Sequence, residues 1–402
     1  MATTTKNGNS QSVIPEKLPV FALLALTMTA FLALLTETFP AGLLPQISQD
    51  LKVSESFAGQ LVTLYAIGAL IAAIPLIAAT QGWRRRPLLL TALGGFLVFN
   101  LITAFSTNYI LTLTVRFLAG MAGGVVWGML AGYSRRMVTD RLQGKAMALA
   151  MLGAPIALSF GVPAGTLLGS LVGWQNTFII MSAVALVLII WVISIVPDYP
   201  GQAHEKQIPV RKVFLIPGIR SVLAVTTVWI LAHGILYTYI VPFLQTAGLA
   251  GRVDVVLLVF GIASVLGLWI TGLLVDRILR RAVIIGLLIF LLASTLMAVS
   301  GSQPEIVYLT IVLWGIAFGG AGTLLQTASA DTAGDSADVA QSMLVTAWNL
   351  AIAGGGIIGG ILLGTFGVNV SPWVAVILLL TGLLITWRSA KYGFKPGPRA
   401  AQ

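Results

Sequence analysis

The chain has 402 residues, of which 57% are hydrophobic and 9% are charged. This composition offers too little polar surface for a soluble protein of that length. Because lipid leaves no partner for unpaired backbone groups, the long apolar runs must be helices. The net charge of +10 does not indicate nucleic-acid binding, since the basic residues are scattered over short gaps and form no continuous surface. The absence of cysteine excludes disulfides and thiolate metal sites.

Twelve apolar runs are long enough to cross a bilayer as helices. The first is too long for a secretory signal and has no small-residue cleavage site, so we expect it to remain as an anchor. The even number of runs places both termini on the same side. In chain order the runs cover residues 19–44, 57–79, 88–106, 109–133, 142–169, 174–196, 219–246, 254–275, 282–300, 305–329, 339–366 and 370–388.

The basic residues predict the orientation of these helices. Twenty of the 23 Lys and Arg residues lie in alternate gaps, which the positive-inside rule assigns to the cytoplasm. The other gaps hold only Lys52 and Arg252, and Arg116 lies inside a span. Both termini are therefore expected in the cytoplasm. The 20 residues are Lys6, Lys17, Arg84, Arg85, Arg86, Arg135, Arg136, Arg141, Lys145, Lys206, Arg211, Lys212, Arg220, Arg277, Arg280, Arg281, Arg388, Lys391, Lys395 and Arg399.

The longest hydrophilic gap divides the chain into two sets of six spans. Its Pro, Gly, Gln, His and charged residues have the composition of a flexible linker. We therefore expect two six-helix bundles joined by a cytoplasmic linker, with a short cytoplasmic tail at each end. The predicted segments are the tail 1–18, the first bundle 19–196, the linker 197–217, the second bundle 218–388 and the tail 389–402.

The two halves align with a shift of about 195 residues, which indicates an internal duplication. Arginines after the second span of each half, glycines in the fourth and fifth spans, and one titratable residue in the first span all fall into register. A four-residue glycine spacing also gives one helix face a smooth stripe for close packing. The matched sets are Arg84–Arg86 with Arg280 and Arg281, Gly120, Gly123 and Gly124 with Gly315, Gly319 and Gly320, Gly161, Gly165 and Gly169 with Gly356, Gly360 and Gly364, and Glu37 with His233.

Two pseudo-symmetric six-helix bundles are typical of transporters that rock one half against the other around a central site. The chain contains no nucleotide-binding G-x-x-x-x-G-K-[ST] loop and no soluble stretch long enough for an ATPase domain. No zinc-spaced histidine cluster and no convincing nucleophile with a base occur either. We therefore predict a transporter driven by a gradient, with no enzymatic activity, no cofactor and no metal.

The loop and helix motifs of the chain resemble those of the major facilitator superfamily, over residues 19–388. The resemblance is strongest to its drug:proton antiporter group, which includes the bacterial sugar (arabinose-type) efflux permeases. The two runs most similar to the sugar-efflux branch are Thr36–Leu44 and His233–Phe243. The resemblance implies the twelve-helix major facilitator fold, a bacterial inner-membrane location, small-molecule export and a monomer.

Three motifs carry the superfamily resemblance and imply gating or conformational roles. The loop motif G-x-x-x-D-R-x-G-R-R is present in the second half, with Leu279 where glycine is usual. In the first half it is degenerate, because Thr80 stands in the place of the aspartate. The Arg-to-Gly spacing of helix four is matched by Arg116 and Gly120, and the G-x-P-x-G motif of helix five is typical of antiporters. The residues to which the resemblance assigns gating roles are Arg84, Arg85, Gly272, Asp276, Arg277, Arg280, Arg281, Gly161, Pro163, Gly165 and Gly169.

Glu37 is the only carboxylate inside the first ten spans, since the other acids fall in loops or at helix ends. A carboxylate there must face a water-filled cavity or keep its proton, and a carrier can use both states to couple protons to transport. Glu37 lies about 27 Å along the first helix from Pro19, in the outer half. Arg116 needs a carboxylate, backbone carbonyls or a polar cavity. It either pairs with Glu37, tunes the proton site, or is a structural tether.

Aromatic and polar side chains in other spans are candidates for proton coupling and substrate binding. His233 titrates near neutral pH when unperturbed and shares a helix face with Tyr237, with Tyr239 nearby; a buried core histidine is the alternative. Tyrosine suits a sugar or a mixed polar and aromatic drug. Asn349 offers a neutral hydrogen-bonding group. Trp127 shares a face with Arg116, and we expect that face to be aromatic at its outer end.

The favoured function is proton-coupled export of small molecules by alternating access, with sugars, sugar-like compounds and amphipathic drugs as substrate classes. The expected partners are the substrate, protons and the lipid bilayer, and neither nucleic acid nor nucleotide. A proton symporter that imports a solute is one alternative, and the helix-five pattern disfavours it. A membrane enzyme or assembly factor is another, and it requires a clustered polar site at one membrane face.

Overall fold

The computed structural model describes residues 18–72, 76, 80, 82–139, 142–201 and 210–395. These residues are almost entirely helical and contain no strand. Eleven helices within them are long and apolar enough to cross a membrane, and the shorter apolar helix α3 takes the place of the second expected span. The predicted end of that span, up to residue 79, lies largely outside the described residues. The all-α membrane fold with twelve spans is confirmed.

The first half contains six spans, several of them built from more than one helical segment. The fifth span is interrupted by a short π-helical segment, η4. The elements are α1 (Val20–Thr38), η1 (Phe39–Leu43), α2 (Leu44–Leu51), α3 (Glu55–Ile71), α5 (Arg85–Phe105), α6 (Tyr109–Arg136), α7 (Gln143–Met151), α8 (Gly153–Ile156), η4 (Ala157–Gly161), α9 (Val162–Val172) and α10 (Trp174–Ile195).

The second half repeats this order after a short helix, α11, inside the predicted linker. Helix α14 holds two spans, because non-helical φ and ψ angles at Ile278 break it within the loop motif. The elements are α11 (Val210–Phe214), α12 (Ile219–Thr238), α13 (Ile240–Thr246), η5 (Ala250–Arg252), α14 (Val253–Ser300), α15 (Pro304–Ala333), η6 (Gly334–Ser336), α16 (Ala337–Phe366), η7 (Val368–Val370) and α17 (Ser371–Arg388).

A proline breaks the first span of each half near the same depth. Proline has no backbone N–H and its ring clashes with the carbonyl four residues earlier, so an α-helix does not continue through it. Helix α1 ends at Thr38, ahead of Pro40, and continues as the 3-10 helix η1. Helix α12 likewise ends at Thr238, ahead of Pro242. The breaks place Glu37 and Tyr239 where the helix direction changes.

Glycines allow the second and fourth spans of each half to pack backbone against backbone. A side-chain carbon on Gly124 of α6 would overlap the Ala69 carbonyl of α3. A side-chain carbon on Gly319 of α15 would overlap the Ser264 carbonyl of α14. Small residues at such crossings let helices approach closely in lipid. The glycines matched by the sequence repeat therefore occupy matching contacts in the two halves.

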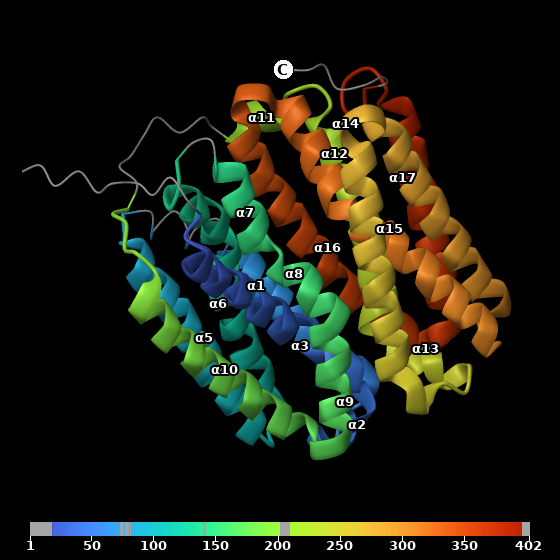
Figure 1. Cartoon of the computed structure of the whole chain (residues 1–402). Coiled ribbons are helices and arrows are strands. Elements are labelled where there is room, and N and C mark those ends of the chain that lie inside the picture. The colour runs from blue at the N-terminus through green and yellow to red at the C-terminus, as the bar shows by residue number, and fades with distance from the viewer. Residues whose placement is uncertain are drawn as a thin grey trace, which may run out of the picture.

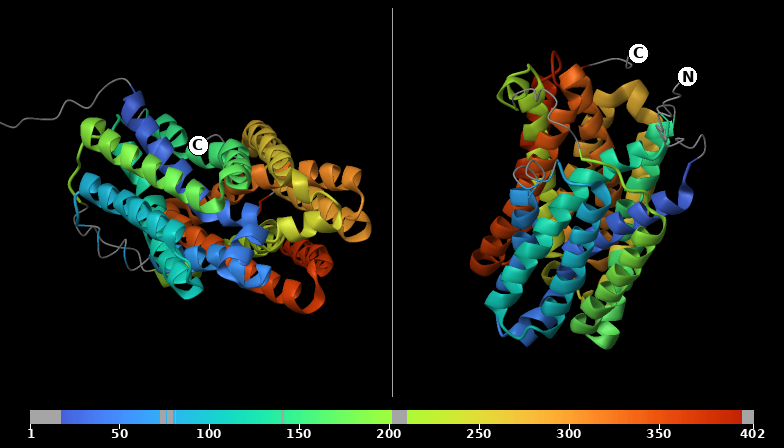
Figure 2. Two further views of the ribbon diagram at one scale, coloured as in Figure 1. Left: turned by 90° about the horizontal axis from the view of Figure 1, so that it is seen from below. Right: turned by 90° about the vertical axis from the view of Figure 1, so that its left-hand side faces the viewer.

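The two halves lie side by side, with α1 to α10 on the left and most of α12 to α17 on the right of Figure 1. We call the lower end of this view, with α2, α9 and α13, the outer end, and the upper end, with α11, the inner end. The view from below in Figure 2 shows the blue segments of the first half beside the olive segments of the second. Helix α13 contacts both η1 and α2 there, so the halves meet at the outer end.

Candidate functional site

Arg116 is completely buried, and backbone carbonyls anchor it. Its Nη2 atom donates to the Glu37 carbonyl at 3.3 Å, and its Nε atom donates to the Leu61 carbonyl at 3.3 Å. The last carbonyls of an α-helix lack partners and carry the negative end of the helix dipole. The break after α1 therefore gives the guanidinium a binding site at a helix terminus. Arg116 also lies over the ring of Tyr65, 4.9 Å from its centroid.

The Glu37 side chain is 5% exposed and makes no direct ion pair with Arg116 within the described part of the chain. Of the three roles expected for Arg116, direct pairing is absent in this conformation. The positive charge is instead held close to Glu37 by the main chain of the same residue. Arg116 therefore combines the two other roles: it is tethered to the backbone carbonyls, and its charge acts on the nearby Glu37 carboxyl group.

Two polar residues near Glu37 were not singled out from the sequence. The Asn100 side-chain amide donates to the Thr36 hydroxyl at 3.3 Å, and the Tyr65 hydroxyl donates to the Ala33 carbonyl at 3.1 Å. Asn100 is completely buried, and its Oδ1 atom has no hydrogen-bond partner. Buried polar atoms are normally paired. Asn100 could have been recognised in the sequence as a lone asparagine within an apolar span. Its side chain places a polar group beside the end of α1.

The outer contact between the halves is a hydrogen-bonded seal, formed by Ser56, Gln60, Tyr239, Gly356 and Gly360. The Tyr239 hydroxyl lies 2.8 Å from the Gly356 carbonyl, and Gln60 donates to that carbonyl and to the tyrosine oxygen, both at 3.2 Å. Ser56 donates to the Gly360 carbonyl at 2.7 Å. We refer to these five residues as the outer seal. Gln60 adjoins Leu61, whose carbonyl binds Arg116 together with that of Glu37, so the seal lies next to the end of α1.

Tyr239 therefore lies in the seal, 1% exposed, and not in an open binding cavity. A substrate contact for it remains a prediction about other conformations. Gly356 and Gly360 belong to the predicted glycine stripe of α16, and they let α3 approach closely: a side-chain carbon on Gly356 would overlap the Thr63 hydroxyl. Ser56 and Gln60 were missed because nothing in one sequence indicates which polar residues face the other half.

The matching stripe in the fifth span packs differently. Gly161 and Gly165 lie against Phe31 and Phe39 of the first half, so this stripe is internal to its own bundle. Pro163 follows the π-helical segment η4, as expected where a proline removes a helix hydrogen bond. Beside this segment the Ser159 hydroxyl donates to the Gly261 carbonyl of α14 at 2.9 Å. This bond is a second link between the halves.

His233 lies in a cluster of aromatic rings in the second half. Its ring stacks on Phe318 with centroids 3.6 Å apart, and the rings of Tyr237, Phe260 and Trp314 lie within 6.0 Å of it. His233 is 7% exposed, and its Nδ1 atom has no hydrogen-bond partner. The cluster spans α12, α14 and α15. It surrounds His233 with aromatic carbon and, among its described hydrogen bonds and ring contacts, with no carboxylate.

Two of the expected substrate residues lie apart from the outer seal. Asn349 is buried on α16, and its amide donates to the Val345 carbonyl at 2.9 Å. The neighbouring Trp348 contacts Phe318 with ring centroids 6.3 Å apart, which links α16 to the His233 cluster. Trp127 packs half-buried against the core of the first half. Because α6 runs from Tyr109 to Arg136, Trp127 lies toward the inner end, and its expected outer position was wrong.

Arginines of the inner loops cap the last helix of their own half. Arg280 donates to the carbonyls of Thr386 and Trp387 at the end of α17, at 2.8 and 3.0 Å. Arg86 donates to the carbonyls of Ile193 and Val196 at the end of α10. A cation at a helix C-terminus is favourable. The two caps come from matching loops of the two halves, and each fastens the last helix of its bundle at the inner end.

Arg84 makes an ion pair with Asp198 at 2.5 Å. Partial burial tends to raise the pKa of Asp198, but hydrogen bonds from Arg84 and the Arg86 N–H, together with their charges, outweigh it and hold that pKa below its usual range. Arg85 donates its backbone N–H to the Tyr199 carbonyl. Arg277, Arg281 and Gly272 are exposed on α14. The Asp276 side chain lies outside the described residues.

Comparison with known proteins agrees with this architecture. A sequence model of the Major Facilitator Superfamily matches residues 26–335 and, separately, residues 240–402. The purine ribonucleoside efflux pumps NepI of Shigella dysenteriae and of Escherichia coli K12 are each 30% identical over 358 residues, which is 88% of this chain and 90% of theirs.

Two solved structures share the fold. A bacterial homologue of the human lysosomal transporter Spinster, in an inward-facing and unoccupied conformation, superposes with a TM-score of 0.73 at 13% identity, over 96% of this chain and all of the other. A mutant of the nucleoside transporter NupG superposes with a TM-score of 0.71 at 15% identity, over 92% and 98% of the two chains.

Proposed function

Because this chain belongs to the major facilitator superfamily, we propose that it is a proton-coupled antiporter that exports small neutral molecules of the nucleoside class. The fold and the family make it a transporter, and the full-length relatives are efflux pumps. Their named substrates, purine ribonucleosides, join an aromatic base to a sugar. The proposal therefore keeps the predicted class of sugar-like substrates and narrows that class to nucleosides.

The observation that carries the proposal is the position of Glu37 next to the outer seal. Its carboxyl group is buried next to a fixed guanidinium, at the end of helix α1. A carboxylate in such a position is strongly unfavourable unless it is protonated or compensated. In the proposed cycle Glu37 takes up a proton when the outer end opens and the substrate leaves. It releases the proton inward once the seal of Tyr239 and Gln60 has closed again.

The aromatic cluster supports a substrate that contains a planar ring. Phe318 and Trp348 are half-buried at its edge, next to buried His233, Tyr237 and Trp314. Aromatic rings stack on planar heterocycles with favourable energy, and Asn349 adds an amide on the helix that carries Trp348. We propose that the base binds against this edge. His233 then serves substrate recognition, while proton coupling rests on Glu37 and Arg116.

Export is favoured over import by two observations. The full-length relatives are named efflux pumps, and the helix-five motif of Gly161, Pro163, Gly165 and Gly169 is the one typical of antiporters in the superfamily. The arginine-rich loops predict that the inner end faces the cytoplasm of a bacterial inner membrane. Substrate then enters from the inner end while the outer seal is closed.

Uptake of radiolabelled inosine into everted membrane vesicles tests this function. We expect accumulation when the lumen is acidic, and loss of accumulation when an uncoupler collapses the gradient. Glu37→Gln should abolish gradient-driven accumulation, whereas Glu305→Gln, an exposed carboxylate at the outer end, should behave like the parent. Accumulation that is indifferent to the pH gradient would remove the proton-coupling claim, and the absence of inosine transport would remove the nucleoside claim.

A further inference from the structure

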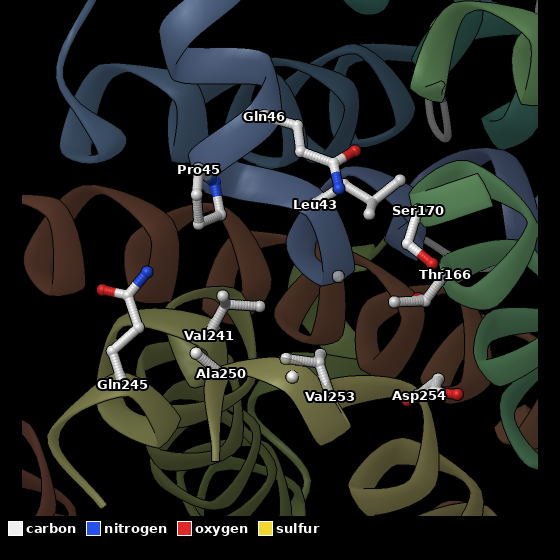
Figure 3. A pocket seen from close by; sticks show the side chains of 12 residues that line it. Leu43, Pro45, Gln46, Thr166, Ser170, Val241, Gln245, Ala250, Val253 and Asp254 are labelled. Carbon is white, nitrogen blue, oxygen red and sulfur yellow. The ribbon is translucent and has the colours of Figure 1, made fainter. Parts of the chain in front are cut away.

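A cavity of about 250 Å³ lies at the outer end (Figure 3), and none of the rings of the His233 cluster is among its described lining residues. Its lining comes from both halves. Gln46 of α2 and Thr166 and Ser170 of α9 face Val241 and Gln245 of α13 and Asp254 of α14 across it. We call it the outer pocket. Its lining residues Gln46, Gln245 and Asp254 are polar. Apolar side chains alone would be enough to close the halves at this surface, so the polar groups point to a further role.

The chemistry of the outer pocket is that of a binding site for hydroxyl groups. The Gln46 amide both donates and accepts hydrogen bonds, and the Asp254 carboxylate accepts them. The Ser170 hydroxyl donates to the Leu167 carbonyl at 2.7 Å and is left as an acceptor, and the exposed Gln245 amide also hydrogen-bonds Glu55. A carboxylate that accepts from a sugar hydroxyl is a common way to recognise ribose. The pocket contains no basic side chain among its described lining residues, which argues against phosphates and other anions.

The size of the pocket limits the ligand. Its volume of about 250 Å³ is below the roughly 300–1,000 Å³ of sites for drug-sized molecules, yet far larger than the space a single water needs. A pentose or a nucleoside is therefore of suitable size. We propose that the outer pocket binds the vicinal hydroxyls of a neutral sugar or nucleoside present on the outer side.

The position of the pocket gives such binding a consequence for transport. Gln46 and Ser170 move with the first half, and Gln245 and Asp254 move with the second, so opening the outer end divides the site. A ligand that binds only the closed arrangement stabilises it. At ten times its dissociation constant it multiplies the ratio of closed to open protein by about eleven. External nucleoside would then slow the reopening of the exporter, a feedback that rests on the proposed substrate class.

Cysteine labelling tests the outer pocket directly, because the chain has no native cysteine. Ser170→Cys places a thiol in the pocket wall, and Ser302→Cys places one in an exposed loop at the same end as a matched control. In purified protein, saturating inosine or ribose should slow maleimide labelling of Ser170→Cys at least fivefold and leave Ser302→Cys unchanged. Hypoxanthine, which lacks hydroxyls of the sugar, should give no protection.

Adding Asp254→Asn or, independently, Gln46→Met should restore rapid labelling of Ser170→Cys in the presence of inosine. No protection by inosine or ribose, protection by hypoxanthine alone, or equal slowing of Ser302→Cys would each overturn the proposal. The vesicle assay keeps the two claims apart. Protection without inosine transport removes the proposed function and leaves the pocket, whereas transport without protection removes the pocket and leaves the function.

Discussion

Removal of one hydroxyl group from the outer seal should open the outer end measurably. In Tyr239→Phe the two bonds that this hydroxyl makes across the halves are lost: the one from Gln60 at 3.2 Å and the one to the Ser56 carbonyl at 3.3 Å. A net hydrogen bond contributes about 0.5–1.5 kcal/mol, and Gln60 keeps its own bond to Gly356. The closed state should therefore lose about 1–2 kcal/mol, which corresponds to a shift of roughly 5- to 30-fold toward the open state.

A thiol behind the seal can report this shift. Thr63 is 1% exposed, packs beside Gly356, and its hydroxyl has no hydrogen-bond partner, so Thr63→Cys should disturb the closed state little. Labelling of Thr63→Cys by a maleimide that does not cross membranes, applied from the outer side, should become 5- to 30-fold faster with Tyr239→Phe.

The control for this prediction is Tyr109→Phe. The Tyr109 hydroxyl donates to the Phe57 carbonyl at 2.9 Å within the first half, at the same end of the bundle. Its loss should leave the labelling rate of Thr63→Cys within a factor of two of the parent. Equal labelling rates in the Tyr239→Phe and Tyr109→Phe backgrounds would refute the assignment of the seal.

Arg116→Lys keeps the positive charge, but a lysine lacks the forked guanidinium that binds the Glu37 and Leu61 carbonyls at the same time. Gradient-driven inosine uptake should therefore fall at least tenfold. Uptake at the parental rate would show that the two carbonyl bonds are dispensable. Gly319→Ala forces a carbon against the Ser264 carbonyl and should destabilise the protein by about 1–3 kcal/mol, seen as a lower melting temperature in detergent, whereas Gly132→Ala, which meets open space, should not. Asp198→Asn should lower the melting temperature at neutral pH. Since ion pairing lowers the pKa of Asp198, its contribution is present above the ordinary value of 3.8 and is lost as the pH falls through the lower folded value; a difference between variant and parent that persists undiminished well below pH 3.8 would contradict this.

The fold was predictable because its signals are local or repeated. Span length and hydropathy identify the helices, and the paired glycines, such as Gly124 and Gly319, mark contacts that the structure repeats in both halves. Arginine pairs in matching loops indicated a common role, which Arg86 and Arg280 fulfil as helix caps. The short helix α11 was not predicted, because a helix of one or two turns is too short to give a recognisable pattern within a polar linker.

The site was predictable only in part, because its chemistry depends on which helices face each other. Glu37 and Arg116 stood out as charges inside apolar spans, but an anchor through a backbone carbonyl has no signature in side-chain identity. Tyr239 was recognised as unusual and assigned to substrate, whereas its hydroxyl bonds Gln60 and the Ser56 carbonyl of the first half. The ring contacts of His233 come from three helices, and a single sequence does not show such convergence.

Proton movement during transport tests the central claim most directly. Everted vesicles with an acidified lumen and a dye that reports lumen pH should show alkalinisation when inosine is added to the medium, because each substrate entering would bring a proton out. Vesicles with Glu37→Gln should show no alkalinisation while the purified variant still binds inosine. Substrate-driven alkalinisation of parental size in Glu37→Gln vesicles would contradict the assignment of Glu37 as the proton carrier.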